Sequence, residues 1–528
     1  MAPISSLIQN LNTVTSFPAG NFEDTAIIIP ETRDAVQKTI SYGDLDRKIS
    51  KCQRELAHMG IAKGSRVAVV LPNGLEFATT FFACARQRAV MAPLNPQSKR
   101  EELEEMLKMI KPAVLVAGAH LPTVKNEAES AARTLHIRVA RWTTSVLVDE
   151  MELVLDTSAL AVSNRAFEYP SFDGAMPGDS VLRLCTSGTT GRPKSVELSH
   201  ENLLTAVRII AAAHHLAPAD RCIIITPLFH VAGIGACLLP TLLTGGTAVI
   251  PASVPARFWD VCREHRITWY HAVPTLHRAL LATPRPATMP ALRFVRCGGS
   301  DLDADLLRAV EDCTGAPLLE IYGMTETAPG VFCNRIDGPA GQPGLFPVPE
   351  AVETRILRRA PGRPLRLTVQ VGVEGEVCVR GRSVMAAYVD DARANADAFL
   401  GGGFFRTGDL GVLLPGGFLR LTGRIKEVIN KGGEKIGPAK VEAAARAHGA
   451  VLEAACFRVK DAIYGEDVGL AVVVKLGHEL SASALKKFLR EKLALFQVPN
   501  VVVFLDSIPT NRTGKIQRTY LSQKYGFY

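Results

Sequence analysis

The sequence lacks any CxxC pair, although its 528 residues include 11 cysteines spread from Cys52 to Cys456. None of these cysteines shows the spacing of a metal site. The pattern argues against a zinc-binding or disulfide-stabilised scaffold and indicates free, mostly buried thiols in a reducing compartment. Internal repeats and low-complexity tracts are lacking too, so repeat and disordered architectures are not expected.

Targeting segments are also missing. The N-terminal MAPISSLIQNLNTV has neither the basic start nor the compact apolar run of a signal peptide, and the C-terminal KYGFY is not a serine-lysine-leucine type of peroxisomal address. The uncharged stretch Val231–Ala256 is long enough to span a bilayer. However, two prolines and the pair Gly245-Gly246 divide it into a helix, a turn and the strand Thr247–Ile250. We therefore expect a cytoplasmic protein without a membrane span.

Positive charge is concentrated near the C-terminus. The formal net charge of the chain is +8, and from Arg424 onward 17 Lys and Arg stand against 10 Asp and Glu, so the first 423 residues are almost neutral. A basic C-terminal unit suits a polyanionic partner such as a nucleotide or a coenzyme, although a merely solvated basic face explains the charge equally well. Because no nucleic-acid motif accompanies the charge, nucleic acid is not expected as a partner.

Short apolar runs alternate with helical patterns over most of the chain, which is typical of α/β layers with buried parallel strands. Arg66–Leu71, for example, precedes the helical pattern Leu75–Arg86. Near residues 371–421 the pattern changes to hairpins, and after Gly423 a compact α+β stretch begins. We predict a large multi-layer N-terminal domain, residues 1–423, with two α/β sheets plus a small β-barrel-like part. A small mobile α+β C-terminal domain, residues 424–528, follows it.

The strongest single feature is the loop Cys185-Thr-Ser-Gly-Thr-Thr-Gly-Arg-Pro-Lys194, which follows the predicted strand Val181–Leu184. Its glycines permit a tight turn that brings backbone N–H groups to an anion, while hydroxyl and basic side chains add donors. It is not a Walker loop, because Pro193 stands where that motif requires glycine. Alone, the loop is equally well explained as a surface turn. Its candidate phosphate ligands are Thr186, Ser187, Gly188, Thr189, Thr190, Gly191 and Lys194.

The segment TSGTTGRPK resembles the signature loop of the adenylate-forming superfamily, which contains acyl-CoA synthetases, luciferases and the adenylation domains of peptide synthetases. Seven further segments follow in the family's order: PLFHVAG (227–233), RCGGSDL (296–302), YGMTE (322–326), GEVCVRG (375–381), FFRTGDLG (404–411), GRIKEVINKGGEKI (423–436) and RTGKIQR (512–518). This resemblance implies an ATP-dependent acid–thiol ligase. Such an enzyme converts a carboxylic acid and ATP to acyl-AMP and pyrophosphate and then forms acyl-CoA, with ATP, Mg²⁺ and CoA as cofactors.

The resemblance also implies which residues surround the nucleotide. Thr325 and Glu326 match residues that contact the phosphates, and Glu326 matches the ligand of Mg²⁺. Asp409 and Arg424 match residues at the ribose. The remaining nucleotide-binding candidates are Gly298, Gly299 and Ser300 along the adenine, Tyr322 stacking on the base, and Gly323.

Further matches concern catalysis and domain movement. Lys515 resembles the lysine that reaches the carboxylate and the α-phosphate, where an ammonium group neutralises both reacting anions. His230 matches a residue that gates access between the acyl site and the thiol channel, and general-base catalysis by it is unsupported. Lys426 matches the hinge about which the small domain rotates between half-reactions. After rotation, the pantetheine tunnel of CoA would be lined by Gly432, Gly433 and Glu434.

Within the superfamily, the chain is most similar to the small-acid branch that contains oxalyl-CoA synthetases. Ala232 and Pro329 stand where oxalate-activating relatives are expected to have pocket histidines, so we expect a monocarboxylic or larger acid. Two alternatives stay open: a free-standing adenylation enzyme that loads a carrier protein in trans, and a nucleotide-binding regulator without catalysis. Intact Lys194, Glu326, Asp409 and Lys515 disfavour the regulator.

Overall fold

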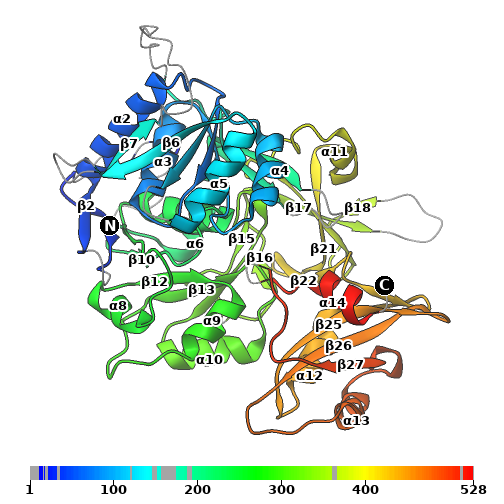
Figure 1. Cartoon of the computed structure of the whole chain (residues 1–528). Coiled ribbons are helices and arrows are strands. Elements are labelled where there is room, and N and C mark those ends of the chain that lie inside the picture. The colour runs from blue at the N-terminus through cyan, green and yellow to red at the C-terminus, as the bar shows by residue number, and fades with distance from the viewer. Residues whose placement is uncertain are drawn as a thin grey trace.

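The computed structural model of the chain describes residues 11–15, 17, 22–31, 36–118, 122–144, 151–155, 174–186, 193–339, 341–358, 366–511 and 515–526. Four sheets form its framework (Figure 1). Three of them are built from strands that end at or before Arg424, and the fourth from strands that begin at Ile429. The predicted mixture of α/β layers followed by a smaller α+β unit is confirmed.

The first sheet leads into the predicted phosphate loop and has the strand order β7-β6-β5-β3-β4-β8-β9, with antiparallel strands at both edges and parallel strands between them. Alternate residues of β3 enter different cores: Val67 and Val69 pack centrally, whereas Ala68 and Val70 pack under α4 and α5. Burial of both faces explains the uninterrupted apolar sequence. The elements are α2 Tyr42–His58, β3 Arg66–Val70, α3 Leu75–Arg86, β4 Val90–Pro93, α4 Arg100–Ile110, β5 Val114–Gly118, α5 Pro122–Thr134, β6 Arg138–Thr144, β7 Met151–Leu155, β8 Ser180–Thr186 and β9 Lys194–Ser199.

The second sheet has the order β15-β14-β13-β12-β10-β11-β1-β2, again with parallel strands between antiparallel edges. One face packs on α8, α9 and α10, and the other faces the central core with α6, η2 and α7. The elements are β1 Thr25–Ile29, β2 Lys38–Ser41, α6 His200–His214, β10 Arg221–Ile223, the π-helix η2 Ala232–Leu238, α7 Leu239–Leu243, β11 Thr247–Val249, α8 Phe258–Glu264, β12 Trp269–Ala272, α9 Pro274–Leu281, β13 Phe294–Gly298, α10 Ala304–Thr314, β14 Leu318–Tyr322 and β15 Phe332–Cys333.

The hairpin region forms a third, antiparallel sheet of order β16-β22-β21-β19-β17-β18, with β20 beside β21. Within the described strands this sheet is open, because its two edge strands, β16 and β18, pair only with β22 and β17 and not with each other. The β-barrel-like part that we expected is therefore corrected to an open sheet, since closure would need these two edges to meet. The elements are β16 Leu345–Pro347, β17 Val352–Arg358, β18 Arg366–Thr368, β19 Glu374–Gly381, α11 Ala392–Ala398, β20 Phe399–Leu400, β21 Phe404–Leu414 and β22 Phe418–Arg424.

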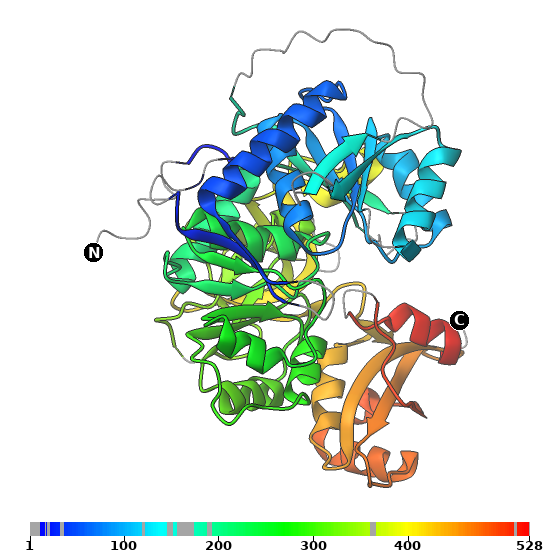
Figure 2. The ribbon, with the colours of Figure 1, turned by 60° about the vertical axis from the view of Figure 1, so that its left-hand side comes forward.

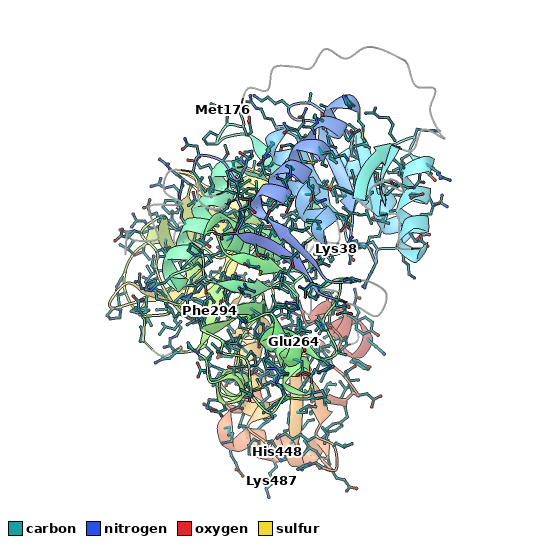
Figure 3. All side chains as sticks on the ribbon, turned by 90° about the vertical axis from the view of Figure 1, so that its left-hand side faces the viewer. Lys38, Met176, Glu264, Phe294, His448 and Lys487 are labelled. Atoms are coloured by element: carbon teal, nitrogen blue, oxygen red, sulfur yellow. The ribbon has the colours of Figure 1, made fainter. Side chains whose placement is uncertain are left out.

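The fourth sheet belongs to a C-terminal lobe that has its own apolar core. Figure 2 shows this orange and red lobe below the blue and cyan part and beside the green part. In Figure 3, His448 and Lys487 mark the end of the lobe farthest from Phe294 in β13. Its elements are β23 Ile429–Lys431, β24 Glu434–Ile436, α12 Pro438–Arg446, β25 Val451–Asp461, β26 Gly465–Val474, α13 Ala482–Lys492, the 3-10 turn η4 Leu495–Gln497, β27 Val501–Phe504 and α14 Arg518–Tyr525.

The uncharged stretch near residue 240 folds as its prolines and glycines predicted. The helical segments η2 and α7 end at Leu243, a turn containing Gly245 with φ +82° follows, and β11 begins at Thr247. None of the helices in the described part of the chain combines the length and the apolar character that crossing a bilayer requires.

Candidate active site

The predicted phosphate loop is held at both ends by one hairpin. Thr186 ends β8 and Lys194 begins β9, and these two residues are register partners. The Thr186 hydroxyl donates a hydrogen bond of 3.4 Å to the Lys194 carbonyl oxygen. Beside them, the buried Ser195 hydroxyl accepts a 2.8 Å hydrogen bond from Arg183, which anchors the start of β9. The other loop candidates, namely Ser187, Gly188, Thr189, Thr190 and Gly191, lie outside the described residues.

Tyr388 connects two of the predicted phosphate-site residues. The Lys194 ammonium nitrogen lies over the Tyr388 ring, 4.3 Å from its centroid, and the Tyr388 hydroxyl donates a 2.8 Å hydrogen bond to Glu326 Oε1. Glu326 and Thr325 lie in the 3-10 turn η3 (Thr325–Thr327), whose Glu326 carbonyl accepts a bond from the Met385 N–H. Sequence reasoning missed Tyr388. Its partners are far away in the chain, so no local spacing could have found it.

A second cluster joins the predicted ribose and adenine residues. Asp409 and Arg424 are register partners in β21 and β22, and Arg424 Nε lies 2.8 Å from Asp409 Oδ1. The Tyr322 hydroxyl donates a 2.7 Å hydrogen bond to Asp409 Oδ2. Burial raises the pKa of Asp409 above its ordinary value, although Arg424 and Tyr322 act in the opposite direction. Asp409 is thus a nearly fully buried carboxylate with both oxygens engaged.

The expected adenine wall lies where β13 and β14 end. Gly298 closes β13, and a side chain there would approach Ile321 to 2.7 Å, so only glycine fits this tight junction. Gly299 and Ser300 follow directly, and Gly323 follows Tyr322 at the end of β14. One face of the Tyr322 ring stacks on Phe332, with 5.4 Å between centroids.

Lys515 enters this site from the C-terminal lobe. Its backbone N–H donates a 2.9 Å bond to the Asn511 side chain, which fixes the loop in front of α14. Burial and the charge of Arg424 lower the pKa of Lys515, while the nearby carboxylates of Asp409 and Glu326 oppose that shift. The structure therefore brings Lys515 together with both clusters, although the three segments are far apart in the sequence.

His230 lies two residues before η2, close enough to Lys515 to be affected by its charge. Burial, together with the charge of Lys515, lowers the pKa of His230 to about 4. Its Nδ1 accepts a 3.3 Å bond from the Ala232 N–H, so in the neutral ring the proton resides on Nε2. At neutral pH the side chain is an uncharged donor that faces a lysine.

The chain matches two profiles of known protein families. The profile of the AMP-binding enzyme family matches residues 19–389, and that of the AMP-binding enzyme C-terminal domain matches residues 440–515. The chain belongs to the AMP-binding enzyme family. The predicted membership of the adenylate-forming superfamily is thereby confirmed.

Individual relatives of this AMP-binding enzyme are similar over almost their whole length. An acyl-CoA synthetase, FUM10, from Gibberella moniliformis is 46% identical, with 95% of this chain and 96% of the relative covered. An oxalate–CoA ligase from Saccharomyces cerevisiae is 33% identical, with 95% of each chain covered. The crystal structure of ATP-bound MatB from Rhodopseudomonas palustris is 27% identical and superposes with a TM-score of 0.84 over 99% of this chain and 98% of that chain.

Two lobes of this AMP-binding enzyme meet around the predicted hinge. The Ile425 N–H donates to the Gly408 carbonyl oxygen at 2.9 Å, and the Lys426 carbonyl oxygen accepts a 2.7 Å bond from Arg458. Arg518, which sequence reasoning also missed, is a half-buried anchor of the Lys515 loop. It contacts the Glu427 carboxylate at 3.0 Å, the Cys456 carbonyl oxygen at 3.1 Å and the Glu442 carboxylate.

The predicted pantetheine segment lies elsewhere in this arrangement. Gly432 and Gly433 form the turn between β23 and β24 with φ angles of +58° and +98°, which favour glycine. The Gly432 N–H donates a 2.9 Å bond to the Tyr464 carbonyl oxygen, and Glu434 is exposed. The described contacts of these residues lie within the C-terminal lobe, so the structure does not bring them to Lys515.

No cluster of three or more His, Cys, Asp or Glu side chains able to hold a metal occurs among the residues that the structure describes. Mg²⁺ bound to nucleotide phosphates needs only one or two carboxylates from a protein. Glu326 suits that limited role, because its Oε2 has no hydrogen-bond partner within the described residues while Tyr388 holds Oε1.

Proposed function

We propose that this AMP-binding enzyme is an acyl-CoA synthetase. In the first half-reaction the oxygen of a carboxylic acid attacks the α-phosphorus of ATP, and pyrophosphate leaves as acyl-AMP forms. In the second, the thiol of CoA attacks the acyl carbon, and AMP leaves as acyl-CoA forms. The convergence of Lys515, Glu326 and the Asp409–Arg424 pair at one site carries this proposal.

The first half-reaction joins two anions, so neutralising and aligning them is the main task. Lys515 supplies a positive charge where the carboxylate and the α-phosphate would meet, and Lys194 supplies one at the other phosphates. Asp409 would accept the ribose hydroxyls, and Arg424, whose Nε lies 2.8 Å from Asp409 Oδ1, orients this carboxylate and opposes the burial that raises its pKa. The face of Tyr322 that is not stacked on Phe332 would receive the adenine, with Gly298, Gly299, Ser300 and Gly323 along its edge.

Mg²⁺ would be held by Glu326, with the hydroxyl of Thr325 beside it. When bound, the ion neutralises the β- and γ-phosphates and makes pyrophosphate a better leaving group. The protein supplies the single carboxylate, and Tyr388 fixes its orientation.

The second half-reaction requires a different placement of the C-terminal lobe. We place the domain boundary at residues 423–427 and the pivot at Lys426. Rotation about it would withdraw Lys515 and bring Gly432, Gly433 and Glu434 to a tunnel that His230 opens to the thiol. The relatives reported above are named for CoA thioester formation, which supports CoA over a carrier protein as the acceptor.

The test is acid-dependent pyrophosphate release, measured over a panel of carboxylic acids with and without CoA. Replacing Lys515 by alanine should lower pyrophosphate release by about 100- to 1000-fold, as expected for loss of one preorganised charge contact. The same variant should still form the thioester from supplied acyl-AMP, because Lys515 acts only in the first half-reaction. Lys487→Ala, at the far end of the same lobe (Figure 3), is the matched control. Equal loss of both half-reactions in Lys515→Ala would refute this assignment, and release without any effect of CoA would favour a carrier-protein acceptor.

A further inference from the structure

Arg183 lies in the middle of β8, inside the apolar run that leads into the predicted phosphate loop, and only 2% of its surface is exposed. Its neighbours Val181, Leu182 and Leu184 are buried apolar side chains of the central core. Arginine almost never lies this deep in a protein unless its charge is paired. An arginine at this position therefore calls for an explanation, which its hydrogen bonds supply.

All three guanidinium nitrogens of Arg183 donate hydrogen bonds. Nε donates to the Ser195 hydroxyl at 2.8 Å, Nη1 to the Glu197 carboxylate at 3.1 Å, and Nη2 to the Met109 carbonyl oxygen at 3.2 Å. Glu197 balances the buried charge, and Met109 lies in the last turn of α4, where the helix dipole favours a cation. The planar guanidinium thus fixes acceptors from β9 and from α4 relative to one another.

These contacts lie on the face of the hairpin opposite the phosphate site. Arg183 and Glu197 are register partners, and Ser195 is two residues nearer the loop along β9, so these three side chains share one face. Lys194 is the next residue of β9 and therefore points to the other face. There its ammonium nitrogen lies over the Tyr388 ring, 4.3 Å from the centroid. Any effect of Arg183 on ATP must therefore be transmitted through β9.

Ser195 is placed to transmit such an effect. Its carbonyl oxygen accepts a 2.9 Å hydrogen bond from the Val389 N–H, and the next residue, Val196, forms an antiparallel bridge with Tyr388. The segment that carries Tyr388 is therefore docked onto the same part of β9 that Arg183 holds from the opposite face. If that part of the strand shifts, the tyrosine and the neighbouring lysine shift with it.

We propose that Arg183 is a positioning residue for the first half-reaction. Acting through Ser195, it holds Lys194 and Tyr388 where the β- and γ-phosphates of ATP bind. This inference rests on the proposed function, in which Lys194 meets these phosphates and Tyr388 orients Glu326 for Mg²⁺. Pyrophosphate leaves as acyl-AMP forms, so the β- and γ-phosphates are absent when acyl-AMP reacts with CoA. Loss of this support should therefore impair acyl-AMP formation and spare the thioester-forming step.

A purely structural role of Arg183 is the competing explanation. A buried arginine that bonds a carboxylate and a helix stabilises a sheet wherever it lies, and its loss would then slow both half-reactions alike. Arg141 is a comparable residue of the same sheet: it lies in β6, and its Nε donates a 2.8 Å hydrogen bond to Glu129 of α5. Three strands separate β6 from β8, so Arg141 provides a matched control away from the phosphate loop.

The test measures pyrophosphate release with ATP varied, together with thioester formation from supplied acyl-AMP. Arg183→Met, which keeps an unbranched side chain without its charge or donors, should lower kcat/KM for ATP by about 10- to 100-fold, as for a small misplacement of bound groups. Ser195→Ala removes one of the three bonds and should lower it by about 10-fold. In both variants KM for the acid and the rate of thioester formation should stay close to the wild-type values. Arg141→Met should lower Tm without changing kcat/KM for ATP.

A second measurement, of nucleotide binding, does not depend on turnover. The rise in Tm produced by ATP with Mg²⁺ is compared with the rise produced by AMP, which lacks the β- and γ-phosphates. In Arg183→Met and Ser195→Ala the shift with ATP should shrink while the shift with AMP remains. If no acid yields pyrophosphate in the wild-type enzyme, the proposed function fails, and this comparison still decides whether Arg183 supports the phosphate site.

Three outcomes would overturn the proposal: wild-type kcat/KM for ATP in Ser195→Ala, equal slowing of both half-reactions in either variant, or an equal change in Arg141→Met. Equal loss of the Tm shifts with ATP and with AMP would contradict it as well. Ser195→Ala decides the matter should Arg183→Met not fold, because it removes a hydroxyl and leaves the Arg183–Glu197 ion pair in place.

Discussion

Replacing Tyr388 by phenylalanine separates the two contacts that this side chain makes in the phosphate site. The substitution keeps the ring beneath the Lys194 ammonium but removes the hydroxyl that donates to Glu326. A hydrogen bond to an ionised carboxylate contributes about 1.5–3 kcal/mol. If Glu326 must be oriented for the metal in the transition state, losing that bond lowers kcat/KM for adenylation by roughly 10- to 150-fold.

The measurement is pyrophosphate release at saturating acid over a range of Mg²⁺ concentrations. We expect Tyr388→Phe to need more Mg²⁺ for half-maximal rate, because the carboxylate is less well oriented before the ion binds. Tyr388→Ala should lose more, since it also removes a cation–π contact of about 0.5–2 kcal/mol. Tyr464→Phe is the matched control: Lys431 lies over this ring too, 5.6 Å from its centroid, but far from Glu326.

A Tyr388→Phe enzyme with the Mg²⁺ dependence and the kcat of the wild type would refute this reasoning. So would a uniform loss of rate that extra Mg²⁺ does not reduce and that is accompanied by a lower Tm, because that combination indicates a packing defect.

The remaining predictions concern pH and the hinge. Burial and the charge of Arg424 lower the pKa of Lys515 below 10.5, so the rate of adenylation should fall as the pH rises through that lowered value. The rate of Lys515→Arg, whose side chain stays charged, should not fall in this way. Lys426→Pro should slow thioester formation more than pyrophosphate release, and equal slowing would contradict a hinge role. Burial lowers the pKa of His277 in the folded protein to about 4, whereas the unfolded chain has a pKa of about 6.5 at this position. As the pH falls from 6.5 to 4, only the unfolded chain binds a proton, and the free energy of unfolding decreases by about 3 kcal/mol in full. Denaturant unfolding at pH 7 and at pH 5 should show about 2 kcal/mol of that loss, and His277→Gln should reduce the difference.

Local sequence patterns predicted the regular elements well, because alternation and turn residues act over short distances. The run Arg66–Leu71 became β3 (Arg66–Val70), and the pattern Leu75–Arg86 became α3 with the same bounds. The change to hairpins near residue 371 corresponds to the third sheet. Whether that sheet closes depends on how its edge strands meet, which no local pattern specifies.

Only the site residues that lie within recognisable sequence motifs could be predicted. Asp409 and Arg424 were matched one by one, and the structure pairs them directly. Tyr388 is 62 positions from Glu326, and Arg518 is 91 positions from Glu427, so their contacts exist only after folding. The complete burial of Arg296 was equally unpredictable, because burial is a property of the packed sheet.

The hydrogen bonds on either side of Lys426 bear on its proposed role as the pivot of the C-terminal lobe. Arg424 forms an ion pair with Asp409, and the Ile425 N–H donates a hydrogen bond to the Gly408 carbonyl oxygen, so both residues contact the N-terminal part of the chain. The Lys426 carbonyl oxygen accepts a hydrogen bond from Arg458, and the Glu427 carboxylate accepts one from Arg518 at the start of α14, so both residues contact the lobe. The N–H groups of Glu427 and Val428 also donate 3.1 Å hydrogen bonds back to the Arg424 carbonyl oxygen, so a rotation about Lys426 would have to break both of these bonds. Lys515 and the Gly432–Gly433 turn would then exchange places through a change of two or three backbone angles, with the contacts of Arg518 intact throughout.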